Sequence, residues 1–298
     1  MTLVKFFHLI HLVDDLDRAD AWYDAVFSPH RFYRAWDPRE RRDASLQLIG
    51  DFIMEPIMAS KAAEDQQMPL SRFYQRFGEH YHSLAWYVEE ETCDDLCHRL
   101  RHAGVRIAKP GGGTFAEGES TDGLFFTHPK DTYGQIEIAA LNSTFRGLDP
   151  RFVEGWSGGF WRDEHPLHLL GPSHITVAVR DLSTARRFYE QQLGGTTLHE
   201  ESTPTTKSAF VLVGSDIVIE LAEPTSPDSR IGQDLAHNGE MPYAVTFRVR
   251  DLEAAERHVT QAGAAVADRA GQTLTLDPAD TFNVVFAFTE RTIPGDPR

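Results

Sequence analysis

Short apolar stretches alternate along this chain with amphipathic segments and polar turns. The first stretch, Phe7–Leu16 (FHLIHLVDDL), is largely apolar and ends at two aspartates, a pattern typical of a β-strand that turns into a helix. Residues 17–27 then place apolar side chains on one side at helical spacing. Three short strands are predicted after this helix, at 30–36, 44–49 and 51–58. The pattern therefore predicts a unit of one strand, one helix and three strands.

The opening stretch returns later in the chain. Ser173–Leu182 (SHITVAVRDL) aligns with it so that His174 falls on His8, an offset of 166 residues. Such an offset is far too long for a solenoid repeat. We interpret the repeat as two homologous domains.

Each predicted domain contains the same unit twice. The second unit has a strand at 80–88, a helix over Glu90–Ala103 that ends at Gly104, and three strands between 105 and 140. The third and fourth units cover 173–223 and 240–288. We therefore expect an α+β fold in which four βαβββ modules pair into two domains with cupped mixed sheets.

The expected domain limits follow from these units. The N-terminal domain is placed at 1–143 and the C-terminal domain at 171–298. The segment between them, 144–170, has no clear period and contains Trp156 and Trp161, so we expect an ordered connection that packs against a domain.

Composition and charge limit the classes of binding partner and the location of the protein. The formal net charge is −16, which argues against binding to nucleic acids or anionic membranes, because both require basic protein surfaces. The only two cysteines, Cys93 and Cys97, lie four apart on a predicted helix, which favours packing over a disulfide framework. No signal-peptide pattern or membrane-spanning apolar stretch is seen. We expect a cytoplasmic protein that acts on a small molecule. Whether the chain forms a homodimer is left open.

Four ionisable residues interrupt the apolar strands of the first domain. His8 and His82 lie in the first strand of a unit, and Glu55 and Glu137 lie in the last strand of a unit. Two units related by a rough two-fold axis would bring one His and one Glu each to a common point. Two imidazoles and two carboxylates suit a divalent metal ion such as Zn, Ni, Co, Mn or Fe(II). His11, three residues from His8, is expected on the opposite face of its strand, in the core.

These residues also resemble a known family. The repeated start H-[IL]-x-x-x-V-x-D-L and the closing D-x-x-G-x-x-E pattern in DTYGQIE resemble the vicinal oxygen chelate superfamily, which includes glyoxalase I, methylmalonyl-CoA epimerase, bleomycin-resistance proteins and extradiol dioxygenases. The resemblance implies paired βαβββ modules, hence two glyoxalase-like domains, with one metal site on a concave sheet face. Its metal ligands correspond here to His8, Glu55, His82 and Glu137.

The second domain departs from this pattern. His174 and Glu220 match His8 and Glu55, but the sequence alignment places Tyr243 where His82 stands. It likewise places Phe286 where Glu137 stands. Two ligands hold a metal poorly, so we expect this domain to be metal-free, with a structural role or a role in shaping the substrate cleft.

The ligand set favours one reaction class. Four protein ligands leave two positions of an octahedron for two neighbouring substrate oxygens and none for O₂. The resemblance then implies a metal-dependent isomerase, epimerase or lyase in which Glu55 or Glu137 moves a proton next to a carbonyl. The alternatives are an Fe(II) extradiol ring-cleaving dioxygenase, in which Glu55 only lies near the metal, and a non-catalytic small-molecule binding protein.

Overall fold

The computed structural model describes residues 3–89, 92–142 and 144–298, and its strands form two sheets of eight. The first sheet contains β1 (Leu3–Leu12), β2 (His30–Asp37), β3 (Arg42–Ile49), β4 (Phe52–Ala59), β5 (His80–Val88), β6 (Ile107–Ala108), β7 (Leu124–Thr127) and β8 (Gln135–Ala140). The second sheet contains β9 (Leu169–Ala178), β10 (Thr196–Ser202), β11 (Thr206–Val213), β12 (Ile217–Pro224), β13 (Met241–Val249), β14 (Val266–Ala270), β15 (Thr273–Leu276) and β16 (Val285–Thr289).

The helices described are α1 (Leu16–Phe27), α2 (Pro69–Phe77), α3 (Cys93–His102), α4 (Pro129–Thr132), α5 (Thr144–Leu148), α6 (Leu182–Gln191), α7 (Arg230–Asn238) and α8 (Leu252–Gln261). The helix predicted over Glu90–Ala103 corresponds to α3; Glu90 and Glu91 lie outside the described residues, as do the expected domain limits at 1 and 143. None of the described helices is long and apolar enough to cross a membrane.

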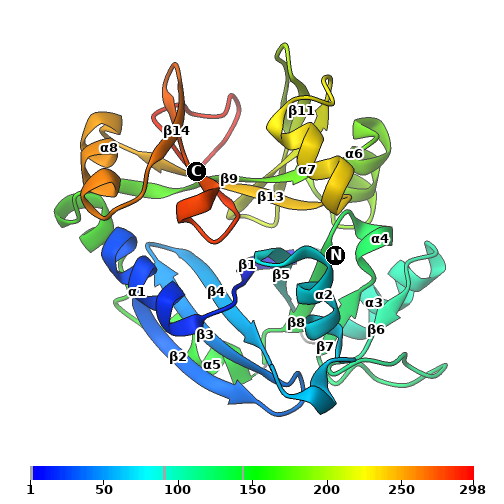
Figure 1. Cartoon of the computed structure of the whole chain (residues 1–298). Helices are drawn as coiled ribbons and strands as arrows, with labels where there is room; N and C mark the ends of the chain where they lie inside the picture. The colour runs from blue at the N-terminus through cyan, green and yellow to red at the C-terminus, as the bar shows by residue number, and fades with distance from the viewer. Residues whose placement is uncertain (1–2, 90–91, 143) are drawn as a thin grey trace.

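The predicted fold class is confirmed. Each sheet joins two βαβββ modules through an antiparallel pair, β1 with β5 and β9 with β13. The strand orders are β2-β3-β4-β1-β5-β8-β7-β6 and β10-β11-β12-β9-β13-β16-β15-β14, so the two sheets have the same topology. The fold is therefore α+β, with four modules paired into two curved mixed sheets (Figure 1).

The acidic residue at the end of each repeated strand explains why a helix follows it. The side chain of Asp15 accepts a hydrogen bond from the backbone N–H of Arg18 at the start of α1. Asp181 caps α6 and Asp251 caps α8 in the same way. An N-cap carboxylate satisfies one of the free N–H groups of the first turn, so these aspartates fix where the helices begin.

One face of each sheet packs into a single core that the two sheets share. Phe27 of α1 lies between them, with its ring 5.4 Å from that of Phe247 in the second sheet. Phe247 also contacts Phe52 of β4 at 5.4 Å. Because these faces meet, the other faces point away from each other, and Figure 1 shows the second sheet above the first with its outer hairpins directed away from it. We call the outer, curved faces the N-terminal cup (β1–β8) and the C-terminal cup (β9–β16).

His11 lies in the shared core, as its position on β1 predicted. It is fully buried, its Nδ1 lies 2.8 Å from the hydroxyl of Tyr23, and its Nε2 lies 3.4 Å from the carbonyl oxygen of Phe282. Burial lowers the pKa of His11 from 6.5 to about 3. Cys93 and Cys97 are buried in the same core, which confirms a packing role for both.

The low pKa of His11 predicts a loss of stability in acid. Between pH 6.5 and about 3 the unfolded chain binds a proton at His11 that the folded chain does not bind, so stability falls as the pH is lowered through this window. The contribution has a slope of at most about 1.4 kcal/mol per pH unit. Urea unfolding at pH 7, 6, 5 and 4 should show a shallower decline for His11→Gln than for the wild type; parallel declines would contradict this assignment.

A repeated Asp-Pro-Arg motif, not identified in the sequence analysis, fastens each first strand. Asp149 holds Arg151, whose Nη1 donates to the carbonyl oxygens of Phe6 and of Asp51 in the β3–β4 turn, both at 3.0 Å. Arg298, held by Asp296, likewise donates to Asp216 in the β11–β12 turn and to Ser173 in β9, at 2.8 and 2.7 Å. We call each Asp–Arg pair with its carbonyl partners a strand clamp.

The first clamp belongs to the segment that joins the two sheets. That segment also donates a hydrogen bond from the indole of Trp161 to the carbonyl oxygen of Phe27, at 2.8 Å. These hydrogen bonds hold the segment against β1, the β3–β4 turn and α1.

Candidate functional site

The four residues predicted as metal ligands lie on the four central strands of the first sheet. Glu55, His8, His82 and Glu137 stand on β4, β1, β5 and β8, which are adjacent in that order. In β8, Ile136 and Ile138 enter the shared core, so Glu137 between them faces the N-terminal cup. Strand alternation thus directs the carboxylate away from the core.

Three of the four form a close cluster. The Nε2 atom of His8 lies 3.2 Å from Oε2 of Glu55 and 3.5 Å from Oε2 of Glu137. All three are buried, with exposures of 2%, 3% and 4% for His8, Glu55 and Glu137. Two carboxylates are therefore held out of water on either side of one imidazole.

Several polar atoms of this cluster have no hydrogen-bond partner. Both ring nitrogens of His8 and Oε2 of Glu55 are buried and make no hydrogen bond, although Nε2 and Oε2 lie within ion-pair distance of each other. Leaving such atoms unpaired costs on the order of 1–3 kcal/mol each, and more for a charged group. Neighbouring ligands of one metal at about 2.1 Å lie roughly 3.0–3.4 Å apart. The unpaired atoms and their spacings therefore fit donors to a divalent ion between His8, Glu55 and Glu137.

Arg42 of β3 lies against this cluster and was not identified in the sequence analysis. Its guanidinium is buried, and Nη2 lies 3.4 Å from Oε1 of Glu55. Burial lowers the pKa of Arg42, but Glu55, Glu137 and Glu40 outweigh it and raise the pKa overall. Strand alternation could have placed Arg42 in the cup. It lies two residues before Ala44 and four before Leu46, so all three side chains lie on the same face of β3.

The charges of the cup leave room for a dication. Glu55, Glu137 and Glu40 contribute three negative charges, and Arg42 contributes one positive charge. Asp37 and Arg39, which complete the ionisable lining at the rim, offset each other. The cup is thus short of two positive charges when its carboxylates are ionised.

His82 stands apart from the cluster. Its ring packs on Phe73 of α2 with centroids 4.6 Å apart, and its Nδ1 lies 3.2 Å from the hydroxyl oxygen of Ser83. Burial, together with the nearby charges of Arg42 and His80, lowers the pKa of His82 from 6.5 to about 3, so the ring is neutral as a ligand must be. Among the described residues, no three or more His, Cys, Asp or Glu side chains are arranged to hold a metal ion as they stand. The four-ligand set stays a prediction.

The N-terminal cup is nearly closed. Its cavity measures about 20 Å³, which is the space of one or two water molecules or an ion. The β2–β3 turn covers it: Glu40 accepts a hydrogen bond from the backbone N–H of Gly111, and Arg39 and Pro110 complete this rim. A substrate would enter only if the contact between Glu40 and the Gly111–Gly113 loop opened.

The C-terminal cup has the equivalent histidine and glutamate. Nε2 of His174 lies 3.4 Å from Oε2 of Glu220, and that carboxylate also accepts hydrogen bonds from Thr176 and Ser208, at 2.6 and 2.7 Å. Burial raises the pKa of Glu220, but His174 and the two hydroxyls outweigh it and lower the pKa to about 2. This carboxylate, unlike that of Glu55, has its hydrogen bonds satisfied within the chain.

The structure corrects the position assigned to Phe286. Phe286 pairs with Val245 as Ile136 pairs with Leu84, so Phe286 matches Ile136 and lies in the shared core. Ala287 is therefore the residue at the position of Glu137. The cause is one extra residue in the preceding turn: the Thr132 hydroxyl reaches the carbonyl oxygen of Gly134, whereas the Thr281 hydroxyl reaches that of Val284. A one-residue shift moves every side chain of a strand to the other face.

Comparisons with known proteins agree with this architecture. Residues 173–277 match the family model described as "Glyoxalase/Bleomycin resistance protein/Dioxygenase superfamily". A curated relative, the uncharacterized protein YqjC of Bacillus subtilis (strain 168), is 37% identical over 76 residues, which are 25% of this chain and 54% of that protein. The chain thus spans about half the length of the curated relative that it matches.

Two solved structures show the extent of the structural likeness. A mutant of 4-hydroxymandelate synthase from Streptomyces coelicolor aligns over 98% of this chain and 95% of its own, with a TM-score of 0.67 and 16% identity. At that identity the likeness shows the fold alone. Methylmalonyl-CoA epimerase from Mycobacterium tuberculosis aligns with 42% of this chain and 90% of its own, at 26% identity and a TM-score of 0.39.

Proposed function

We propose that this chain is a two-domain member of the vicinal oxygen chelate superfamily whose N-terminal cup holds one divalent metal ion and catalyses proton transfer next to a carbonyl; the family model matched by residues 173–277 and the two-domain fold support this. The substrate would be a small molecule that offers two neighbouring oxygens, and the reaction an isomerisation, an epimerisation or a lyase step. The observation that carries this proposal is the imidazole of His8 between two buried carboxylates, none of whose contacts with it is a hydrogen bond.

The residues that would hold the ion are His8, Glu55 and Glu137, with His82 as the fourth. When bound, such an ion polarises a substrate oxygen as a Lewis acid and stabilises negative charge next to it. His8 is already in contact with both glutamates, so it fixes the centre of the site. His82 lies on the neighbouring strand and would complete the set through a change of its side-chain rotamer.

The two glutamates differ in their surroundings, and this difference assigns the base. Glu55 contacts both His8 and Arg42, so each of its two oxygens has a close partner. Glu137 contacts His8 at 3.5 Å, and Arg42 acts on it only from a greater distance. Glu137 has fewer close partners than Glu55 and is therefore the better candidate to take and return a substrate proton. The rim formed by Glu40 and Gly111 would exclude water during that transfer.

Metal analysis tests the proposal first. Protein purified without chelator should contain about one Zn, Ni, Co, Mn or Fe per chain. His8→Ala should lose it, and the matched variant His174→Ala in the other cup should keep it. A metal-free wild type that binds no added Co(II), or equal metal content in both variants, would contradict the proposal.

The base is tested by deuterium exchange. Wild-type protein loaded with metal should incorporate solvent deuterium next to the carbonyl of a carbon acid such as methylmalonyl-CoA or an α-hydroxy ketone, as followed by NMR. Glu137→Ala should reduce that exchange by about 10²–10⁴-fold, the usual contribution of a general base. Full metal content together with full exchange in Glu137→Ala would exclude this role. Oxygen uptake on catechols by the Fe(II)-loaded protein would instead assign it to the ring-cleaving dioxygenases.

A further inference from the structure

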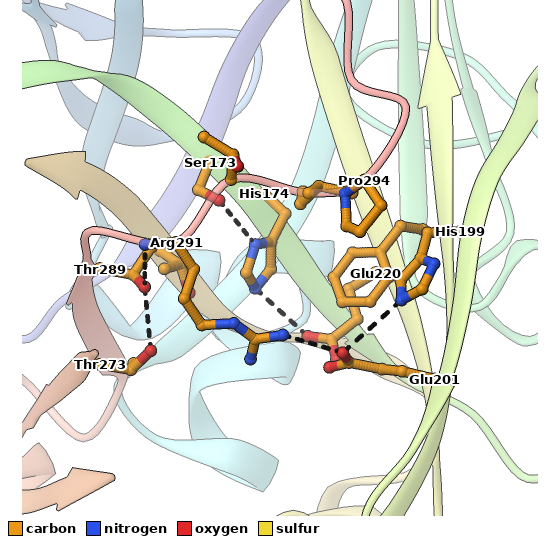
Figure 2. Close-up of a pocket in the computed structure, with 13 residues that line it drawn as sticks. Ser173, His174, His199, Glu201, Glu220, Thr273, Thr289, Arg291 and Pro294 are labelled. Carbon is orange, nitrogen blue, oxygen red and sulfur yellow. Dashed lines mark hydrogen bonds and ion pairs between the residues drawn. The ribbon is translucent and has the colours of Figure 1, made fainter. Parts of the chain in front are cut away.

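We propose that the C-terminal cup is a second ligand site, which binds a small, neutral, polyhydroxylated molecule through the hydroxyl-lined cavity beside His174 and Glu220, without a metal. This site goes beyond the proposed function, because it lies in the other cup and shares no residue with the first. Figure 2 shows its side chains pointing into one cavity from β9, β12, β15, β16 and the segment after β16.

The two cups differ most in their free space. The cavity of the C-terminal cup measures about 170 Å³, against about 20 Å³ in the N-terminal cup. Pockets for drug-sized ligands measure roughly 300–1,000 Å³, so this cavity suits a molecule no larger than a monosaccharide or a cyclitol.

The extra space arises because equivalent strand positions of the two cups carry side chains of different kinds. The apolar residues Phe7, Ala85, Leu124 and Ala139 pack together in the N-terminal cup. The matching strand positions of the C-terminal cup carry Ser173, Thr246, Thr273 and Thr289, all of which line its cavity. A filled apolar wall has thus been replaced by four hydroxyl groups, each of which both donates and accepts hydrogen bonds.

The charges favour a neutral ligand. Glu220 already has His174, Thr176 and Ser208 as partners, and Glu201 pairs with Arg291 at 3.0 Å. An anion would approach two carboxylates, and a cation would compete with Arg291. A ligand hydroxyl, in contrast, can donate to a remaining lone pair of Glu220 and accept from a threonine without breaking these pairs.

One wall of the cavity is aromatic, with the ring of His174 edge-on to that of Phe210. The ring of Phe210 lies 5.4 Å from that of His174 and stacks at 6.1 Å on that of His199. Such a wall accommodates the C–H face of a saturated ring, while the hydroxyls of Thr273 and Thr289, 3.0 Å apart, lie on the opposite side of the cavity (Figure 2). Apolar contact on one side and hydroxyls on the other suit a cyclic polyol.

Binding to defined probes tests the site. The full chain, stripped of metal with EDTA, would be examined by saturation-transfer NMR and calorimetry with D-glucose, D-ribose and myo-inositol, and with D-glucuronate and D-glucosamine as charged counterparts. We expect saturable binding of at least one neutral probe, and weaker binding of both charged ones. No binding of any neutral probe, or a preference for a charged one, would overturn the proposal.

Variants locate the binding. Ser173→Phe restores the residue of the N-terminal cup and should abolish binding, and Glu220→Gln should weaken it roughly 10-fold through loss of a charged acceptor. Thr273→Val, which keeps the side-chain shape, serves as a second test should Ser173→Phe fold poorly, and it should also weaken binding. His8→Ala should bind the probe as the wild type does. Unchanged affinity in Thr273→Val and Glu220→Gln would refute the site, whereas failure of the metal proposal would leave this binding intact.

Discussion

Replacing Arg151 by alanine is expected to lower the free energy of unfolding by about 3–5 kcal/mol, the usual cost of removing one partner of a buried ion pair. The side chains of Arg151 and Asp149 have exposures of 2% and 0%. Without the guanidinium, the carboxylate of Asp149 stays buried without its cation. The carbonyl oxygens of Phe6, Phe7 and Asp51 also lose a donor. Urea unfolding followed by tryptophan fluorescence and circular dichroism measures the loss.

Two further variants separate the clamp from a general effect of removing charge. Arg162→Ala removes an arginine whose partner, Asp163, is exposed, and should change stability by at most about 1 kcal/mol. The double variant Asp149→Asn/Arg151→Ala should recover part of the loss, because no buried charge is then left unpaired. If Arg151→Ala were no more destabilising than Arg162→Ala, the clamp would have no energetic role.

Replacing Arg42 by methionine is expected to destabilise the metal-free protein by a similar amount, about 3–5 kcal/mol. Arg42 is the buried cation nearest to Glu55, and its removal leaves Glu55, Glu137 and Glu40 without a positive charge at close range. A divalent ion would replace that charge, so Zn²⁺ or Co²⁺ should stabilise Arg42→Met by more than it stabilises the wild type. Thermal and urea unfolding, each with and without the metal, measure both effects.

The matched control for this prediction is Arg39→Met. Arg39 lies in the β2–β3 turn, three residues before Arg42, but is exposed, so its loss should change stability little. Equal effects of the two substitutions would show that Arg42 does not balance the buried carboxylates. A metal that stabilises Arg42→Met no more than wild type would count against an ion among His8, Glu55 and Glu137.

The face on which each candidate residue lies could be predicted from the sequence. His8 and His11 differ by an odd number of positions on one strand, and the structure places His8 in the cup and His11 in the shared core. The repeat also identified Glu55 and Glu220 as equivalent. What local pattern could not supply was distance: His8 reaches both glutamates, whereas His82 packs on Phe73 of α2, a helix that lies outside the repeated unit.

The sequence by itself determined the repeat, the four βαβββ modules and the side of each strand that carries charge, because these follow from local alternation and from helix caps. Only the tertiary structure decided which residues meet. It brought Arg42 from β3 to Glu55, moved Phe286 into the core through one extra turn residue, and placed the two cups on opposite sides of a common core. Register between strands and packing between sheets depend on contacts far apart in the chain, and hydrophobic periodicity contains no information about them. For the same reason, the sequence did not predict the open cavity of the C-terminal cup. That cavity depends on which hydroxyl-bearing residues occupy the strand positions that apolar residues fill in the N-terminal cup.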